Sequence, residues 1–185
     1  MRAKILLQLK PLKQFSIPFT GLKIGKHLFE FDIDNSFFDA FEYSLIKEGA
    51  LKATVELDKQ ETMLVLQIQI DGTVKLECDK CLAAFDSPMA ITERQIVKFA
   101  EDELESDDLE IIILNKKESS IDVAPILYEL ITVSIPFIKN CEDGGNGQIC
   151  DQEMIARLEN LAPGTEQKEE TDSEDPRWAA LRKLK

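Results

Sequence analysis

The sequence predicts an α+β protein with an antiparallel β-meander or barrel-like sheet, one packed amphipathic helix and a basic C-terminal helix. Apolar and polar residues alternate over several segments between residues 28 and 99, which is the period of strands buried on one face. Residues 122–134 instead place apolar side chains at the spacing of one helical face. Residues 176–185 carry four cations, no acid and an apolar stripe, which predicts the basic helix.

The first elements along the chain are two short strands and a short helix. The strands are expected at residues 5–9 and 28–33. Asp34 then offers a capping oxygen ahead of phenylalanines at positions 37, 38 and 41, whose spacing fits one face of a helix that ends before Gly49.

The clearest element is an antiparallel hairpin. Residues 51–57 and 64–70 both alternate, and a polar turn joins them. Asp71-Gly72 allows either a tight turn or a glycine bulge within one longer strand, and the alternation that continues beyond Gly72 favours the bulge. In either case Cys78 closes a strand.

Further strands are expected at residues 89–99, after a turn at Ser87-Pro88, and at residues 110–114. The segment between them, near residues 100–110, holds seven acids and no base. Such a segment cannot pack against a core, so a solvated loop or disordered insert is expected.

The helix over residues 122–134 has Asp122 as its expected N-cap and Pro125 in its first turn, and Pro136 ends it. A second amphipathic helix is expected at residues 154–161. The resulting organisation is a domain at residues 1–162, an acidic linker at 163–175 and a basic amphipathic tail at 176–185.

Composition narrows the class of protein. The chain has 185 residues with 22 Lys and Arg against 35 Asp and Glu, a net charge of −13. Such a charge opposes general attraction to a phosphate backbone, so any nucleic-acid contact should be local, and no DNA partner is expected. No stretch has the roughly 20 apolar residues of a membrane span, and the start does not resemble a signal peptide, so we expect a cytoplasmic protein.

The four cysteines, Cys78, Cys81, Cys141 and Cys150, form two pairs. The first pair has the spacing of a zinc knuckle, in which two thiolates from one turn make half of a tetrahedral site. The second pair flanks a gap rich in glycine, which can fold back to supply the other half. Zinc bound by all four is one hypothesis; ordinary reduced thiols and a redox role are the alternatives.

Little in the sequence points to catalysis. His27 is the single histidine, so no Ser/His/Asp, Cys/His or multi-histidine metal arrangement can be assembled beyond that one position. No phosphate-binding glycine motif is present. We therefore expect a protein that is not an enzyme.

The C-terminal tail allows two interpretations. Its residues with binding chemistry are Arg177, Trp178, Leu181, Arg182, Lys183 and Lys185. They form either a terminal helix that docks on the protein's own core or a short basic amphipathic element that docks into a partner or onto ribosomal RNA. In the second case the acidic linker tethers this element to the domain. A lone tryptophan flanked by arginines has the residue types enriched at binding hot spots.

Several motifs occur in a characteristic order: Cys78-Asp79-Lys80-Cys81-Leu82, Ile121-Asp122, Glu129, Ile135-Pro136, two further cysteines and the ending DPRWAALRKL at residues 175–184. From about residue 20 to its end the chain resembles the bacterial YceD family of large ribosomal RNA subunit accumulation proteins. Many members have a denser second cysteine cluster than the two cysteines seen here. The resemblance implies a non-enzymatic factor in 23S rRNA synthesis, processing or accumulation, with the four cysteines as metal-ligand candidates.

The predicted function is therefore a ribosome-biogenesis factor that binds rRNA or a ribosomal protein, directly or indirectly. Two alternatives remain: a thiol redox protein using Cys78 and Cys81, and an acidic chaperone for a basic ribosomal protein.

Overall fold

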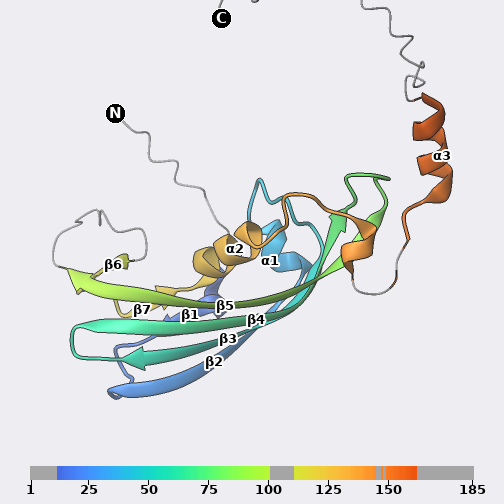
Figure 1. Cartoon of the computed structure of the whole chain (residues 1–185). Helices are drawn as coiled ribbons and strands as arrows, with labels where there is room; N and C mark the ends of the chain where they lie inside the picture. The colour runs from blue at the N-terminus through green and yellow to red at the C-terminus, as the bar shows by residue number, and fades with distance from the viewer. Residues whose placement is uncertain (1–11, 101–110, 145–146, 148, 162–185) are drawn as a thin grey trace, which may run out of the picture. The chain divides into compact units, whose positions relative to one another are not determined.

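The computed structural model in Figure 1 describes residues 12–100, 111–144, 147 and 149–161. Contacts divide the chain into two units, residues 1–150 and 151–185. The expected strand at residues 5–9, the acidic segment at 101–110, and the linker and tail lie outside the described residues, so these expectations stay predictions.

The first unit is built on one five-stranded sheet. Its strands are β2 (Gly25–Ile33), β3 (Gly49–Lys59), β4 (Met63–Glu77), β5 (Ala84–Ala100) and β6 (Ile111–Asn115), in the order β2-β3-β4-β5-β6. β2 to β5 pair antiparallel in sequence order. The α+β class and the meander are confirmed, and the sheet is open, with β2 and β6 at its edges.

The other elements are short. They are η1 (Lys13–Phe15), β1 (Ser16–Pro18), α1 (Asn35–Asp39), β7 (Ser120–Asp122), α2 (Ala124–Val133), η2 (Cys141–Gly144) and α3 (Gln152–Leu161). β1 and β7 pair as a separate two-stranded sheet. α3 belongs to the second unit and confirms the helix expected near residues 154–161.

One face of the sheet holds the core. Along β4 the residues from Leu64 to Leu76 alternate between buried and exposed, apart from the buried Val65 and the half-buried Gly72. The helices α1 and α2 both lie over one face of the sheet (Figure 1). Aromatic rings join these covering elements, since Phe41 stacks on Tyr128 of α2 with ring centroids 3.9 Å apart. The hydrophobic effect of this burial therefore fixes which side of each strand faces inward.

The predicted bulge at Gly72 is wrong, although the long strand is confirmed. Gly72 pairs with Leu51 on one side and Met89 on the other, and neither ladder shifts register there. The glycine is needed for close approach instead: its φ is +148°, and a Cβ atom would lie 2.3 Å from the carbonyl oxygen of Ala50. Since the alternation stays in phase, Cys78 falls on the buried face.

The predicted turn at Ser87-Pro88 is also wrong. Both residues lie inside β5, where Pro88 pairs with Thr73, and the turn lies between β4 and β5 at residues 78–83. Among the described residues β6 pairs with β5 only from Ile96 to Ala100, so β5 has one neighbour at Pro88. A proline is tolerated in such an edge position.

The direction of β6 departs from a pure meander, because it runs parallel to β5. Alternation within a strand reports which face is buried and carries no information about the direction of the neighbouring strand.

The helix ends agree with the sequence in part. The Asp34 carboxylate accepts from the backbone N–H groups of Ser36 and Phe37 and so caps α1. Asp122 is not the N-cap of α2; that position is Val123, while the Asp122 carboxylate accepts from the Ala124 N–H at 3.0 Å. No helix in the described part of the chain is long and apolar enough to cross a membrane.

Candidate metal centre

The two longest strands carry the site. β3 stops pairing with β4 at Val74, whereas β4 and β5 continue to pair as far as Glu77 and Ala84. The β4–β5 hairpin therefore extends beyond β3, and its turn holds Cys78 and Cys81 (Figure 1).

The other two cysteines come from beyond α2. Cys141 begins η2, and Cys150 follows the glycine-rich segment. η2 packs closely on β5, because a Cβ atom on Gly144 would lie 2.9 Å from the carbonyl oxygen of Asp86. A small residue at this position lets the η2 backbone approach the hairpin.

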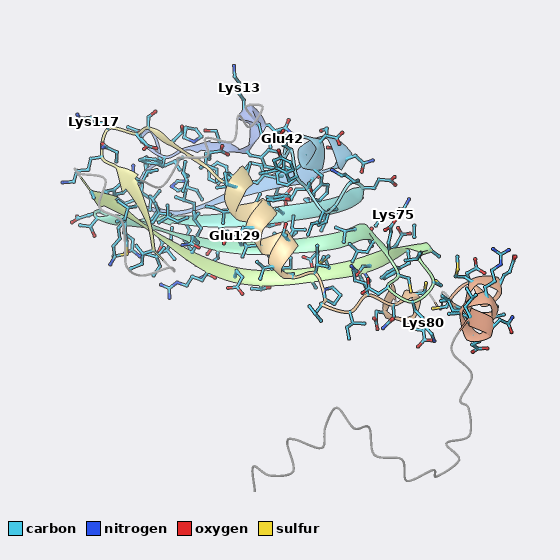
Figure 2. All side chains as sticks on the ribbon, turned by 90° about the horizontal axis from the view of Figure 1, so that it is seen from above. Lys13, Glu42, Lys75, Lys80, Lys117 and Glu129 are labelled. Carbon is cyan, nitrogen blue, oxygen red and sulfur yellow. The ribbon has the colours of Figure 1, made fainter. Side chains whose placement is uncertain are left out.

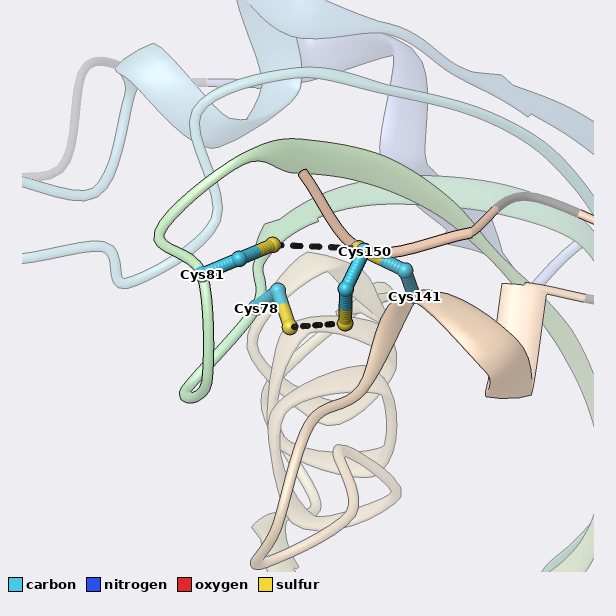
Figure 3. A group of neighbouring side chains, drawn as sticks. All are labelled: Cys78, Cys81, Cys141 and Cys150. Carbon is cyan, nitrogen blue, oxygen red and sulfur yellow. Dashed lines mark hydrogen bonds between the residues drawn. The ribbon is translucent and has the colours of Figure 1, made fainter. Parts of the chain in front are cut away.

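The four cysteines meet in one buried cluster (Figure 3). The Sγ atoms of Cys78 and Cys150 are 3.8 Å apart, those of Cys81 and Cys141 are 3.6 Å apart, and all four lie within 4.8 Å of one another. A disulfide needs about 2.05 Å between sulfurs, so none of the four cysteines forms a disulfide in this structure.

These distances fit a tetrahedral metal. With zinc–sulfur bonds of about 2.3 Å, the edge of a regular tetrahedron of sulfurs is about 3.8 Å. The Sγ–Sγ distances for the Cys78–Cys150 and Cys81–Cys141 pairs are within a few tenths of an ångström of that edge. Within the described part of the chain, no other group of three or more Cys, His, Asp or Glu residues is arranged to hold an ion.

Backbone hydrogen bonds close the turn that holds Cys78 and Cys81, which we call the knuckle. The Cys78 N–H donates to Ala83 O, and the Leu82 N–H donates to Cys78 O, both at 2.9 Å. Leu82 takes a φ of +61°, a left-handed conformation that side chains other than glycine, asparagine and aspartate seldom adopt. The turn therefore holds its first two sulfurs at some cost in backbone strain.

The thiols have unequal acidity. Burial raises the pKa of the Cys78 thiol, but three backbone N–H groups donate to its sulfur and bring the pKa down to about 6. The donors belong to Cys81, Lys80 and Cys141. Burial, followed by the neighbouring thiols, raises the pKa of Cys141 to about 12, and burial also raises the pKa of Cys150.

The cluster by itself thus favours one thiolate, since further negative sulfurs would lie a few ångströms from the first. A dication reverses this preference because it attracts all four thiolates at once.

An ion pair joins the two halves of the site. The Asp79 N–H donates to Lys139 O at 2.8 Å, and the Lys139 N–H donates to Asp79 Oδ2 at 2.8 Å. Lys139 Nζ lies 3.1 Å from Asp79 Oδ1. The Lys139 N–H is the main cause of the lowered pKa of Asp79, followed by its ammonium group. This clamp aligns the segment before Cys141 with the knuckle.

The sequence does not reveal the clamp, because Asp79 and Lys139 are sixty residues apart and each is an ordinary surface residue type. The structure brings together all four predicted cysteines. The predicted partner-binding residues Arg177, Trp178, Leu181, Arg182, Lys183 and Lys185 lie outside the described residues.

The family model for the large ribosomal RNA subunit accumulation protein YceD matches residues 66–185. The chain belongs to the YceD family. The match begins within β4 and takes in all four cysteines, α2 and the C-terminal tail. The resemblance seen in the sequence is thereby confirmed over residues 66–185, while the stretch from about residue 20 to residue 65 lies outside the match. The family's name implies a role for this chain in the accumulation of large-subunit rRNA. No curated protein and no solved structure matches the chain.

Proposed function

We propose that this YceD protein is a non-enzymatic ribosome-biogenesis factor of the cytoplasm that supports 23S rRNA synthesis, processing or accumulation by binding rRNA or a ribosomal protein. The family match supports the ribosomal role. The presence of a single histidine, His27, supports binding over catalysis, because no multi-histidine arrangement can form.

The observation that carries the proposal is the four-cysteine cluster. In it, Cys78, Cys81, Cys141 and Cys150 hold one zinc ion, which when bound supplies a structural cross-link between the hairpin turn and the segment after α2. The residues of the chain prepare this link, because Asp79 and Lys139 position the backbone and the knuckle N–H groups stabilise the first thiolate. A small open sheet gains stability from such a link.

The C-terminal tail is the second part of the proposal. Arg177, Trp178, Leu181, Arg182, Lys183 and Lys185 engage a large-subunit component. The cationic and aromatic composition of this stretch supports it, as does its place inside the family match. If truncation after Asp175 leaves precursor association and 23S rRNA levels unchanged, this part is wrong.

The test compares Cys81→Ser with the wild-type chain. Loss of bound zinc, a lower melting temperature and a fall in 23S rRNA together are the expected result. A thiol redox protein is the competing candidate, favoured by the low pKa of Cys78. It predicts instead a variant that folds normally and loses only activity, and a reversible Cys78–Cys81 disulfide in the wild type.

A chaperone for a basic ribosomal protein is the other candidate, and the net charge of −13 favours it. Co-purification with such a protein that survives nuclease but dissolves in moderate salt is its expected result. Loss of the association on nuclease treatment would instead leave rRNA as the partner.

A further inference from the structure

Large apolar side chains are exposed beside the cysteine cluster. Leu82 is 66% exposed, Phe137 99%, Ile138 61% and Ile149 74%. Leu82 follows Cys81 directly, and Ile149 precedes Cys150. Phe137 and Ile138 lead into Lys139, which is clamped to the knuckle. We call these four residues the cysteine-end patch.

Single exposed apolar residues are common on proteins, but several gathered at one place mark interaction sites. Burial of such side chains in an interface is favourable because it removes apolar surface from water. Fourteen other phenylalanine and isoleucine side chains in the described part of the chain are buried, among them Phe15, Phe37 and Ile46. Phe137, in contrast, has the most exposed large apolar side chain of the described residues.

A hollow adjoins the patch. It has a volume of about 510 Å³. Four apolar residues line it together with three lysines and two glutamates: Leu45, Leu76, Ala84, Ile135, Lys47, Lys75, Lys139, Glu48 and Glu77. Lys139 lines the hollow and also follows Ile138 in the chain, so projecting side chains and a recess lie at the same end of the sheet. Interfaces with tightly bound protein partners combine such anchors and recesses.

The charges around the cysteine-end patch do not favour binding of the phosphate backbone of RNA. Lys75 pairs with Glu48, and Lys139 pairs with Asp79, so these four charges cancel. The other charged groups at this end are Lys47, Lys80, Glu77, Asp86, Glu142 and Asp143. Lys75 and Lys80 are labelled at the hairpin end in Figure 2. Four carboxylates thus outnumber two lysines, and four thiolates around one zinc ion would add two negative charges.

The side-chain types point the same way. Three of the four patch residues are aliphatic, whereas RNA recognition stacks unpaired bases on aromatic rings and neutralises phosphates with Lys and Arg. A protein with apolar side chains and surplus positive charge complements both the patch and its surroundings.

We propose that the cysteine-end patch docks a basic protein of the large ribosomal subunit through an apolar contact. This proposal rests on the proposed ribosomal function and names the partner class and the surface used. Phe137 and Ile138 are its anchors, and the adjoining hollow receives an apolar side chain of the partner.

The test places a photo-cross-linking phenylalanine analogue at position 137 of the full-length chain. The matched control carries the same analogue at position 28 in β2, where Leu28 is also exposed at 62%. Each variant is irradiated with two probes, the RNA-free total protein of the large subunit and protein-free 23S rRNA. The expected result is a cross-link from position 137 to one basic protein, with at least tenfold lower yield from position 28.

Three outcomes would overturn the proposal: cross-links from position 137 to 23S rRNA instead of protein, equal yields from the two positions, or no adduct with either probe. The double variant Phe137→Ser/Ile138→Ser provides an independent check, with Leu28→Ser as its control. Binding of the purified cross-linked protein should weaken at least tenfold in the double variant, with unchanged zinc content and melting temperature. Unchanged binding would contradict the proposal.

The two proposals fail in distinguishable ways. The proposed function is contradicted if the wild-type protein contains no zinc. It is also contradicted if cells that lack the protein keep the same level of 23S rRNA. A zinc-loaded chain that supports 23S rRNA but gives no protein adduct at position 137 counts against the docking surface alone.

Discussion

Asp79 and Lys139 join two segments sixty residues apart. Their contacts are one backbone–backbone hydrogen bond, one hydrogen bond from the Lys139 N–H to the Asp79 carboxylate, and an ion pair. Asp79 lies between Cys78 and Cys81, and Lys139 lies two residues before Cys141. Residues that orient metal ligands in this way typically change metal affinity about 10- to 100-fold when they are removed.

Asp79→Ala is therefore expected to weaken zinc binding by about 10- to 100-fold, because the Lys139 N–H and ammonium lose their acceptor. Competition against a chromophoric chelator measures the change. Glu77→Ala removes a nearby exposed carboxylate from β4 and should bind zinc as the wild type does. Equal affinities in both variants would show that the clamp does not position the ligands.

Leu82 tests the strain in the knuckle. Because its φ is +61°, glycine at this position avoids the contact between Cβ and backbone that alanine retains. The free energy of unfolding of the Leu82→Gly variant should be larger than that of the Leu82→Ala variant by about 1 kcal/mol. Urea denaturation of the zinc-loaded variants measures this difference, and a Leu82→Ala chain at least as stable would contradict it.

Gly72 tests the close approach of β3 and β4. Gly72→Ala places a Cβ atom 2.3 Å from Ala50 O, whereas Gly25→Ala, also at positive φ, meets nothing within 4 Å. The first variant should lose about 1–3 kcal/mol of stability beyond the loss in the second. Comparable losses in both variants would mean that backbone strain alone accounts for the glycine.

Asp34 gives a prediction for acidic pH. The Ser36 hydroxyl is the main cause of the lowered pKa of Asp34, and the backbone N–H groups of Phe37 and Ser36 add to it. Because the folded-state pKa lies below the ordinary value of 3.8, the stabilisation is present above pH 3.8 and disappears as the pH falls through the folded-state pKa.

Asp34→Ala should therefore lower stability by about 1 kcal/mol at pH 7, as loss of an N-cap does. The difference in stability between this variant and the wild type should become smaller below pH 3.8. Asp39→Ala, on the exposed side of α1, is the control and should show neither effect. Thermal unfolding between pH 2 and pH 7 measures both, and a difference that persists at the lowest pH would refute the capping role.

The sequence predicted most strands because burial on one face leaves an alternating apolar and polar pattern. This pattern can be recognised in a single segment without knowing which strand pairs with it. It failed at Ser87-Pro88, where local turn preference was overridden by pairing with β4, and at Asp122, which lies one residue outside the N-cap. The parallel direction of β6 and the contact between Asp79 and Lys139 depend on distant segments, so no local pattern encodes them.

The candidate site was predictable for a different reason. The spacing of Cys78 and Cys81 constrains two sulfurs to one turn, and the end of an alternating strand places Cys78 on the buried face. The approach of Cys141 and Cys150 required the fold, because η2 reaches the hairpin only through its packing on β5. The exposed Phe137 carries no sequence pattern that separates it from a core phenylalanine.

The central claim is that the four cysteines hold one zinc ion. Elemental analysis of untagged protein purified without chelator tests it most directly, together with thiol titration before and after a mercurial releases bound metal. The account predicts about one zinc per chain, with all four thiols masked until the metal is released. No zinc and four freely titrating thiols would contradict it.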